Sequence, residues 1–204
     1  MTEHVTFWFD ATCPFCWQTS RWMKEVEKVR DIEIEWVPMS LSVLNEGRDL
    51  PADYMAAMDA AWGPARVFAK VKQEHPDKIG ELYTAMGTMI HAEHQGGKQG
   101  TGAYNDIIAA ALDKVGLPAT IAEVADTNDE DDLLRGYHKT AMDEVGDEVG
   151  TPVVKLGNTA FFGPVITRVP TGEEAGTLFD AAVTLAGFDY FFELKRSRTE
   201  DPQV

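Results

Sequence analysis

The chain has 204 residues, of which 44% are hydrophobic and 25% are charged. That apolar content is enough for the core of a globular domain and excludes an intrinsically disordered chain. Acidic residues outnumber basic ones by 34 to 18, so the formal net charge is −16. A charge this negative opposes sequence-independent binding to nucleic acid or to an anionic membrane, and we expect neither partner.

The N-terminus carries no basic segment ahead of its first apolar run, and that run ends at Asp10. A secretory signal has a basic segment followed by a longer apolar one, so none is recognisable here. No apolar stretch approaches the ~20 residues that cross a bilayer. The sequence therefore predicts a soluble protein with a cytoplasmic location.

Only two cysteines are present, Cys13 and Cys16, and they belong to one Cys-Pro-Phe-Cys motif. A single pair cannot form the disulfide framework of a small secreted domain. A disulfide within so short a loop also restrains little of the unfolded chain. The motif therefore indicates thiol chemistry rather than a structural role.

The N-terminal part of the chain has the pattern of a strand, a helix and a second strand. Residues 5–10 form a continuous apolar run, which is typical of a strand buried on both faces. Apolar residues then recur at helical spacing from the Cys motif to Val29, and Pro14 fits the first turn, where a missing N–H is tolerated. Alternating Ile and Glu residues predict the second strand over 32–37, ending at Pro38.

The segment that follows has helical patterns rich in alanine and methionine. We expect four to six helices over residues 50–149, with breaks at Gly63-Pro64, His75-Pro76, the glycine-rich stretch 96–102 and Leu117-Pro118. The glycine-rich stretch matches no phosphate-binding motif. We interpret it as a flexible loop over the site or as a linker.

Strand patterns return after this helical segment. Residues 152–156 and 159–162 predict a hairpin, and the capping-box pattern at 171–174 predicts a helix that runs to about Ala186. A βαβ half, a helical insertion and a ββα half, with a Cys-x-x-Cys at the first strand-to-helix junction, predict a thioredoxin fold of the α/β class. We assign residues 1–49 and 150–204 to the thioredoxin-like domain and residues 50–149 to the inserted helical domain.

The position of the two cysteines suggests different roles for them. Cys13 lies at the predicted helix N-terminus, where unpaired N–H groups and the helix dipole favour a thiolate, so we assign it as the nucleophile. Cys16 follows one turn later and is placed to attack a mixed disulfide on Cys13, which is the task of a resolving thiol. Zinc is the alternative, but it would need two further ligands, such as His91 and His94.

The sequence Gly150-Thr151-Pro152 stands directly before the third predicted strand. If Pro152 is cis, the backbone of Thr151 lies beside the cysteines as an edge with which a substrate can pair. If it is trans, the proline only opens the strand. The Cys-x-x-Cys motif favours the first interpretation, so Thr151 and Pro152 are candidate substrate-binding residues.

Two further groups of side chains have an open interpretation in the sequence. His91 and His94 are expected on one helical face, either solvated or binding a metal or substrate. Trp17, Trp22 and Trp36 are expected in the core rather than as platforms for a cofactor.

Short motifs with a common resemblance are spread along nearly the whole chain. They are Phe7-Trp8-Phe9-Asp10, Cys-Pro-Phe-Cys-Trp, Ser20-Arg21-Trp22, Met39-Ser40-Leu41, Leu44-Asn45-Glu46, Leu82-Tyr83-Thr84-Ala85, Gly150-Thr151-Pro152, Phe161-Phe162-Gly163-Pro164 and Phe191-Phe192-Glu193-Leu194-Lys195-Arg196. Together they resemble the actinobacterial mycothiol-dependent nitroreductases, which are cytosolic, DsbA-like proteins with a thioredoxin fold.

The resemblance implies that Cys13 attacks or reduces the substrate, that Cys16 closes the disulfide, and that mycothiol restores the dithiol. It also implies that Asn45 and Tyr54, which match site positions of the family, orient the substrate. Phe15 stands where the family usually has tryptophan, so an aromatic face remains but the indole N–H is lost, which bears on the range of nitro substrates. We expect no bound cofactor and no metal, with mycothiol as a thiol co-substrate.

These features predict a cytosolic thiol-disulfide oxidoreductase that reduces small electrophiles such as nitroaromatics or disulfides, with a homodimer as one option for its assembly. One alternative is a DsbA-like or FrnE-like oxidoreductase that acts on the disulfides of other proteins. Another is a redox switch without turnover, in which the state of Cys13 and Cys16 moves the helical insertion. Kappa-class glutathione transferases share the architecture but carry serine at the position of Cys13.

Overall fold

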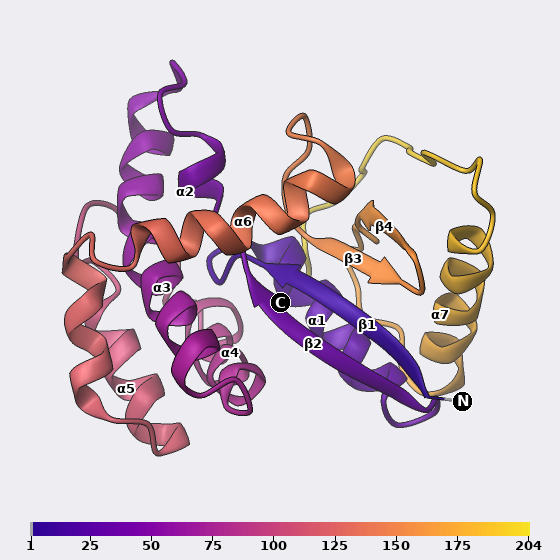
Figure 1. The fold of residues 1–204 in the computed structure, drawn as a ribbon, viewed down its shortest axis with the longest axis horizontal. Coiled ribbons are helices and arrows are strands. Elements are labelled where there is room, and N and C mark those ends of the chain that lie inside the picture. Colours follow the sequence, from indigo (N-terminus) through magenta and orange to yellow (C-terminus); the bar gives the residue numbers. More distant parts are fainter. Residues whose placement is uncertain (1) are drawn as a thin grey trace.

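The computed structural model describes residues 2–204, and its centre is a four-stranded sheet in the order β2-β1-β3-β4 (Figure 1). β1 pairs with β2 in parallel and with β3 antiparallel, and β3 and β4 form a hairpin. The strands are β1 (Glu3–Phe9), β2 (Ile32–Pro38), β3 (Val153–Leu156) and β4 (Thr159–Phe162).

Helices cover both faces of this sheet and extend beyond it. In Figure 1, α1 lies behind the sheet and α6 crosses in front of it, while α3, α4 and α5 gather on the left and α7 on the right. The helices are α1 (Pro14–Val26), α2 (Leu41–Leu44), α3 (Ala52–Glu74), α4 (Ile79–Gly87), a π-helical turn (Thr88–Ala92), α5 (Asn105–Val115), a 3-10 helix (Ala119–Asp126), α6 (Asp131–Val145) and α7 (Glu173–Ala186). None of the helices within residues 2–204 is long and apolar enough to cross a membrane.

The predicted fold class is confirmed: a βαβ unit and a ββα unit enclose a long helical segment. One cluster of buried side chains includes Phe7 of β1, Trp22 of α1, Phe68 of α3, Leu82 of α4 and Ile108 of α5. The sheet and the helical segment therefore share a core. The division into two domains at residues 50 and 149 stays a prediction.

The predicted helix break at Gly63-Pro64 is wrong, because α3 runs through both residues. A proline inside a helix removes one backbone hydrogen bond, and this energetic cost is the reason for expecting a break here. The packing of the 3-10 helix against α3 offsets the cost: a Cβ on Gly63 would lie only 3.5 Å from Cβ of Ala125. Both Gly63 and Pro64 are buried, so tertiary packing overrides the local preference here.

The predicted capping box at residues 171–174 is also wrong, although the helix that it predicted is present. α7 begins at Glu173 after Gly172, whose φ is 57°, and no side chain caps this helix end. The acidic Glu173 instead forms an ion pair with Arg30 of the loop after α1, at 2.6 Å. The start of α7 is therefore fixed by a contact distant in sequence.

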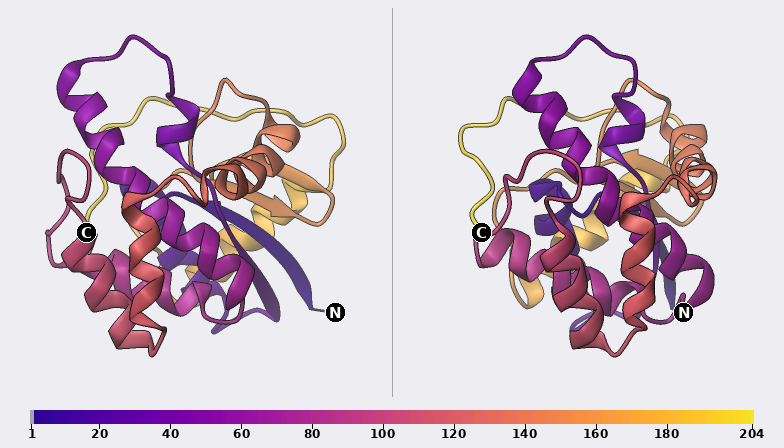
Figure 2. Two further views of the ribbon diagram at one scale, coloured as in Figure 1. Left: turned by 60° about the vertical axis from the view of Figure 1, so that its left-hand side comes forward. Right: turned by 90° about the vertical axis from the view of Figure 1, so that its left-hand side faces the viewer.

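The C-terminal tail, which comprises residues 187–204, returns from α7 toward the rest of the molecule. Both views in Figure 2 show this tail in yellow, running across the upper part of the molecule, below the purple loop between α2 and α3, before it turns down to the C-terminus. The ring of Phe191 packs against Phe161 of β4, with the two centroids 5.7 Å apart. The tail is therefore in contact with the thioredoxin sheet.

The close approach of α4 to α1 gives a test of this packing. A Cβ added to Gly87 would lie 2.5 Å from Cζ3 of Trp17, so we expect Gly87→Ala to lower the free energy of unfolding by about 1–3 kcal/mol. Gly136→Ala is the matched control, because nothing lies within 4 Å of that position and alanine is a better helix former; it should stabilise by about 0.5–1 kcal/mol. Urea unfolding of both variants measures the difference. Equal stability of the two variants would contradict the packing of Gly87 on Trp17.

Candidate active site

The β1–α1 junction places Cys13 at the start of α1. β1 ends at Phe9, and Cys13 is the N-cap of α1, with extended backbone angles (φ −77°, ψ 117°) and Pro14 as the next residue. The sulfur of Cys13 accepts a hydrogen bond from the backbone N–H of Cys16 at 3.5 Å. An N-cap sulfur facing free N–H groups is the arrangement that stabilises a thiolate.

The two cysteines are free thiols in a buried setting, with 5% and 0% of their surfaces exposed. The hydrogen bond between the two thiols contributes most to lowering the pKa of Cys13, against the opposing effect of burial. Burial, together with the hydrogen bond to Cys13 and the charge there, raises the pKa of Cys16 well above its ordinary value. Cys13 is therefore the thiol that ionises first.

Thr151 and Pro152 lie against Cys13 at the start of β3. The bond between them is cis, and the thiol of Cys13 lies 3.8 Å from the carbonyl oxygen of Thr151, to which it donates. The Thr151 hydroxyl is buried and lowers the pKa of both cysteines. The structure therefore brings together the four predicted residues Cys13, Cys16, Thr151 and Pro152.

Asp10 is a residue of the site that the sequence reasoning did not identify. Its carboxylate is buried and accepts hydrogen bonds from the N–H and hydroxyl of Thr12 and, on its other oxygen, from the N–H of Leu41 at 2.8 Å. Burial raises the pKa of Asp10, and these hydrogen bonds oppose that rise. The sequence placed Asp10 at the end of an apolar strand and within the motif Phe7-Trp8-Phe9-Asp10, but it gave this residue no role.

The predicted pairing of His91 and His94 is wrong. The π-helical turn ends at Ala92, and His94 adopts a left-handed conformation with φ 55°, so the two residues do not share a helical face. His94 is exposed, whereas His91 is buried and its Nε2 lies 2.9 Å from the carbonyl oxygen of Ala11. Burial lowers the pKa of His91 to about 4, so the ring is neutral at pH 7 and Nε2 donates to Ala11.

Asn45 and Tyr54 contact each other at the entry to the helical segment. Asn45 is the C-cap of α2, and its Nδ2 donates to the carbonyl of Leu41 at 2.9 Å and approaches the Tyr54 hydroxyl at 3.4 Å. Leu41 is the same residue whose N–H binds Asp10. The pair is thus connected to the β1–α1 junction through α2, and within residues 2–204 neither side chain forms a hydrogen bond with Cys13. Asn45 is buried and Tyr54 is 41% exposed.

Phe15, the residue between Pro14 and Cys16, is half-buried and packs against the main core. Trp17, Trp22 and Trp36 are buried members of the same core, so their predicted role is confirmed. The glycine-rich stretch is attached to α3, because the N–H of Gly100 donates to the carbonyl of Ala56 at 2.8 Å.

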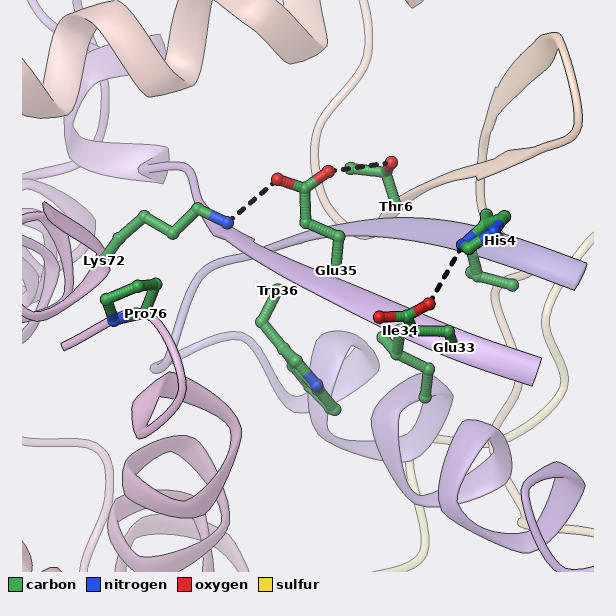
Figure 3. Close-up of a pocket in the computed structure, with 9 residues that line it drawn as sticks. His4, Thr6, Glu33, Ile34, Glu35, Trp36, Lys72 and Pro76 are labelled. Atoms are coloured by element: carbon green, nitrogen blue, oxygen red, sulfur yellow. Dashed lines mark hydrogen bonds and ion pairs between the residues drawn. The ribbon is translucent and has the colours of Figure 1, made fainter. Parts of the chain in front are cut away.

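One hollow of the structure is lined by neither cysteine. It has a volume of about 330 Å³ and is lined by residues of β1 and β2 together with Lys72 and Pro76 (Figure 3). Its two acidic side chains both have partners: Glu35 lies 3.0 Å from Lys72, and Glu33 lies 3.2 Å from His4. Within residues 2–204, no group of three or more His, Cys, Asp or Glu side chains is arranged to hold a metal ion.

A thioredoxin sheet with a Cys-x-x-Cys at the start of α1 and a cis-proline before β3 defines the class of DsbA-like thioredoxin-fold proteins. The chain is similar to solved structures of that class: probable DsbA oxidoreductase SCO1869 from Streptomyces coelicolor (TM-score 0.60, 17% identity, 97% of this chain and 94% of that one) and DsbA from Chlamydia trachomatis (TM-score 0.58, 12% identity, 91% and 89%). At these identities the likeness shows the fold alone.

The family follows from the sequence comparison. Residues 12–196 match the model of the Rv2466c-like family, described as mycothiol-dependent nitroreductase Rv2466c, and the chain belongs to this family of oxidoreductases. It is also 29% identical over 197 residues to the Mycobacterium tuberculosis relative named uncharacterized protein Rv2286c, a match that covers 96% of this chain and 82% of the relative.

The unequal thiols predict a distinct pH profile for alkylation. We expect the rate of Cys13 modification by iodoacetamide to rise with pH and to level off at a midpoint below ~8.5, the value of a free thiol, because the folded protein stabilises its thiolate. Cys16 should stay unmodified over the same range, since its pKa is raised. Peptide mass spectrometry of the reduced protein measures both rates. A Cys13 midpoint equal to that of the urea-unfolded chain would contradict this assignment.

Proposed function

We propose that this protein is a cytoplasmic thiol-disulfide oxidoreductase that uses Cys13 and Cys16 to carry two electrons from mycothiol to small electrophiles such as nitroaromatics or low-molecular-weight disulfides. The observation that carries the proposal is the geometry of the two thiols in a chain of the Rv2466c-like family. Cys13 has a lowered pKa at a helix N-terminus, and Cys16 is held protonated one turn away. No bound cofactor enters this scheme, and the low-molecular-weight thiol is a substrate.

The electrons balance in both half-reactions. When the dithiol becomes the Cys13–Cys16 disulfide, it releases two electrons and two protons, which convert a nitro group to a nitroso group and water, or a disulfide to two thiols. Two mycothiol molecules then reduce the protein disulfide, first forming a mixed disulfide on Cys13, and leave as mycothiol disulfide. Cys13 is the attacking thiolate in the first half-reaction, and Cys16 displaces the bound product.

Asn45, Tyr54, Phe15, Thr151 and Pro152 are proposed to position the substrate. Thr151 offers its backbone beside Cys13. Phe15 offers the face of an aromatic ring between the two cysteines. The polar pair of Asn45 and Tyr54, which reaches the junction through Leu41, would orient a polar group of the substrate.

A second candidate function is supported by the position of the Thr151 backbone. Because its carbonyl lies against Cys13 beside a cis-proline, an extended polypeptide can pair with it and bring a protein disulfide to the thiol. In that case the substrates are cysteines of other proteins, and mycothiol serves only to reset the enzyme. The two candidates differ in which electrophile is turned over.

Single substitutions of the cysteines separate the steps of the mechanism. We expect Cys13→Ser to reduce mycothiol-driven turnover of a chromogenic nitroaromatic to the uncatalysed background, since the attacking thiolate is lost. With mycothiol disulfide as the substrate, the Cys13 thiolate of Cys16→Ser should displace one mycothiol and remain as a mixed disulfide with the other, because no second thiol resolves it. Mass spectrometry detects this species. Full turnover by Cys13→Ser would overturn the mechanism. Turnover confined to an unfolded disulfide-bonded protein substrate would favour the second candidate.

The proposed role of the Asn45–Tyr54 pair has its own test. Tyr54→Phe removes only the hydroxyl, so we expect KM for the nitroaromatic to rise about two- to tenfold, the effect of losing one hydrogen bond, with little change in the unfolding midpoint. Tyr190→Phe is the matched control, because that ring is 77% exposed in the C-terminal tail. Equal KM values for the two variants would remove Tyr54 from the site.

A further inference from the structure

The C-terminal tail is docked on the thiol end of the molecule by several polar contacts. Gln18 of α1 donates through Nε2 to the carbonyl of Gln203 at 2.7 Å, and the N–H of Gln203 donates to the carbonyl of Thr167 at 2.8 Å. The carboxylate of Glu200 accepts from the Thr167 hydroxyl at 2.6 Å and from Arg168 at 2.7 Å. The last residues of the tail are therefore attached both to α1 and to the loop after β4.

This docking places a guanidinium over the ring of Phe15, which stands between the two cysteines in the sequence. The Cζ atom of Arg198 lies 4.7 Å from the ring centroid of Phe15, which is within the range of a cation–π contact. Phe15 occupies the first turn of α1, two residues after Cys13. Arg198 lies two residues beyond residue 196, where the match to the family model ends.

The charge of Arg198 is uncompensated, unlike that of its neighbours. Arg168 is paired with Glu200, and Arg30 is paired with Glu173 and Asp180, whereas no ion pair of Arg198 is present among residues 2–204. The side chain is exposed, so this charge faces solvent. An exposed, unpaired cation beside a reactive thiol attracts anions to it.

The rest of the molecule has the opposite charge. The net charge of −16 repels an anionic substrate during its approach. Lys195 and Arg196 precede Arg198, so residues 194–199 carry three basic side chains and no acidic one, within a tail that also has four acidic residues. This short basic run therefore places positive charge near the first turn of α1 in an otherwise acidic protein.

We propose that Arg198 is a specificity-determining residue of the Cys13 site, and that it favours electrophiles and disulfides that carry an anionic group, such as a carboxylate, close to the reacting atom. The inference rests on the proposed function insofar as Cys13 is the thiol that substrates meet. It deepens that function by naming the charge class of the small-molecule substrate. Phe15 is the positioning residue, because its ring holds the guanidinium over the first turn of α1.

Two alkylating reagents that differ only in charge test this proposal without requiring turnover. With iodoacetate or iodoacetamide, the Cys13 thiolate forms a sulfur–carbon bond and iodide leaves, but only iodoacetate carries a carboxylate. The measured quantity is the ratio of the two rate constants at Cys13, obtained by peptide mass spectrometry of the reduced full-length protein at low ionic strength. A change in the pKa of Cys13 affects both rate constants equally, so their ratio reports the charge near Cys13.

We expect Arg198→Gln to lower the iodoacetate-to-iodoacetamide ratio about threefold and Arg198→Glu to lower it about tenfold, as follows from one or two unit charges acting across several ångström of wet surface. Arg196→Gln is the matched control, since it removes the same charge from the same tail and makes no recorded contact with Phe15; its ratio should stay close to that of the unmodified protein. In 1 M salt, where charges are screened beyond about 3 Å, the differences should vanish.

Several outcomes would overturn the proposal. An equal ratio in Arg198→Gln and the unmodified protein would show that the guanidinium does not act at Cys13. If Arg196→Gln lowers the ratio as much as Arg198→Gln does, the general charge of the tail, and not Arg198 specifically, determines the ratio. A Cys13 that neither reagent modifies in any variant would exclude a role in admitting small electrophiles. If the unmodified protein does not turn over the nitroaromatic but the iodoacetate-to-iodoacetamide ratios are as expected, the result counts against the proposed function alone.

Discussion

The geometry of the thiol site depends on the hydrogen bonds that the buried carboxylate of Asp10 accepts. One of its oxygens closes the turn after β1 by accepting the N–H of Thr12, and the other holds the N–H of Leu41, where α2 begins. Hydrogen bonds to a carboxylate contribute about 1.5–3 kcal/mol each when buried. Because they fix where α1 starts, they make Cys13 its N-cap, and the same carboxylate sets the position of α2, which ends at Asn45.

In the mechanism that we propose, the unequal environments of the two thiols determine the order of the chemical steps. Cys13 receives the N–H of Cys16 and the stabilising effect of Thr151, whereas the sulfur of Cys16 is fully buried and lies beside the Cys13 charge. The pair therefore holds one negative charge at a time, and it resides on Cys13. Once Cys13 is part of a mixed disulfide, that charge is gone. The pKa of Cys16 then falls, so resolution follows attack.

Local patterns in the sequence were sufficient to predict the framework of the fold. A continuous apolar run gives β1, a helical repeat after the Cys motif gives α1, and alternation gives β2, because in each case burial of one or both faces dictates the order of residues. The placement of Cys13, Cys16, Thr151 and Pro152 followed from the same framework. These residues lie at the ends of elements whose order a thioredoxin topology determines.

Contacts between distant segments could not be predicted in this way. The donation from His91 to Ala11, the contact of Arg198 with Phe15 and the continuity of α3 through Pro64 each depend on packing between segments far apart in sequence. No local repeat or motif encodes such a contact. Asp10 belongs to the same group, since its importance depends on an N–H donated from the segment after β2.

Trp17 shows why the helical segment and the thiol site must be considered together. Its indole stacks on the ring of His91 with centroids 5.6 Å apart, lies beneath the guanidinium of Arg21 at 4.3 Å, and leaves no space for a side chain at Gly87. His91 in turn donates to Ala11, two residues before Cys13. Trp17, which follows Cys16 in the sequence, is thus packed between α1 and the end of α4. Because this packing is close and rigid, a shift of these helices would be transmitted to the turn that carries Cys13.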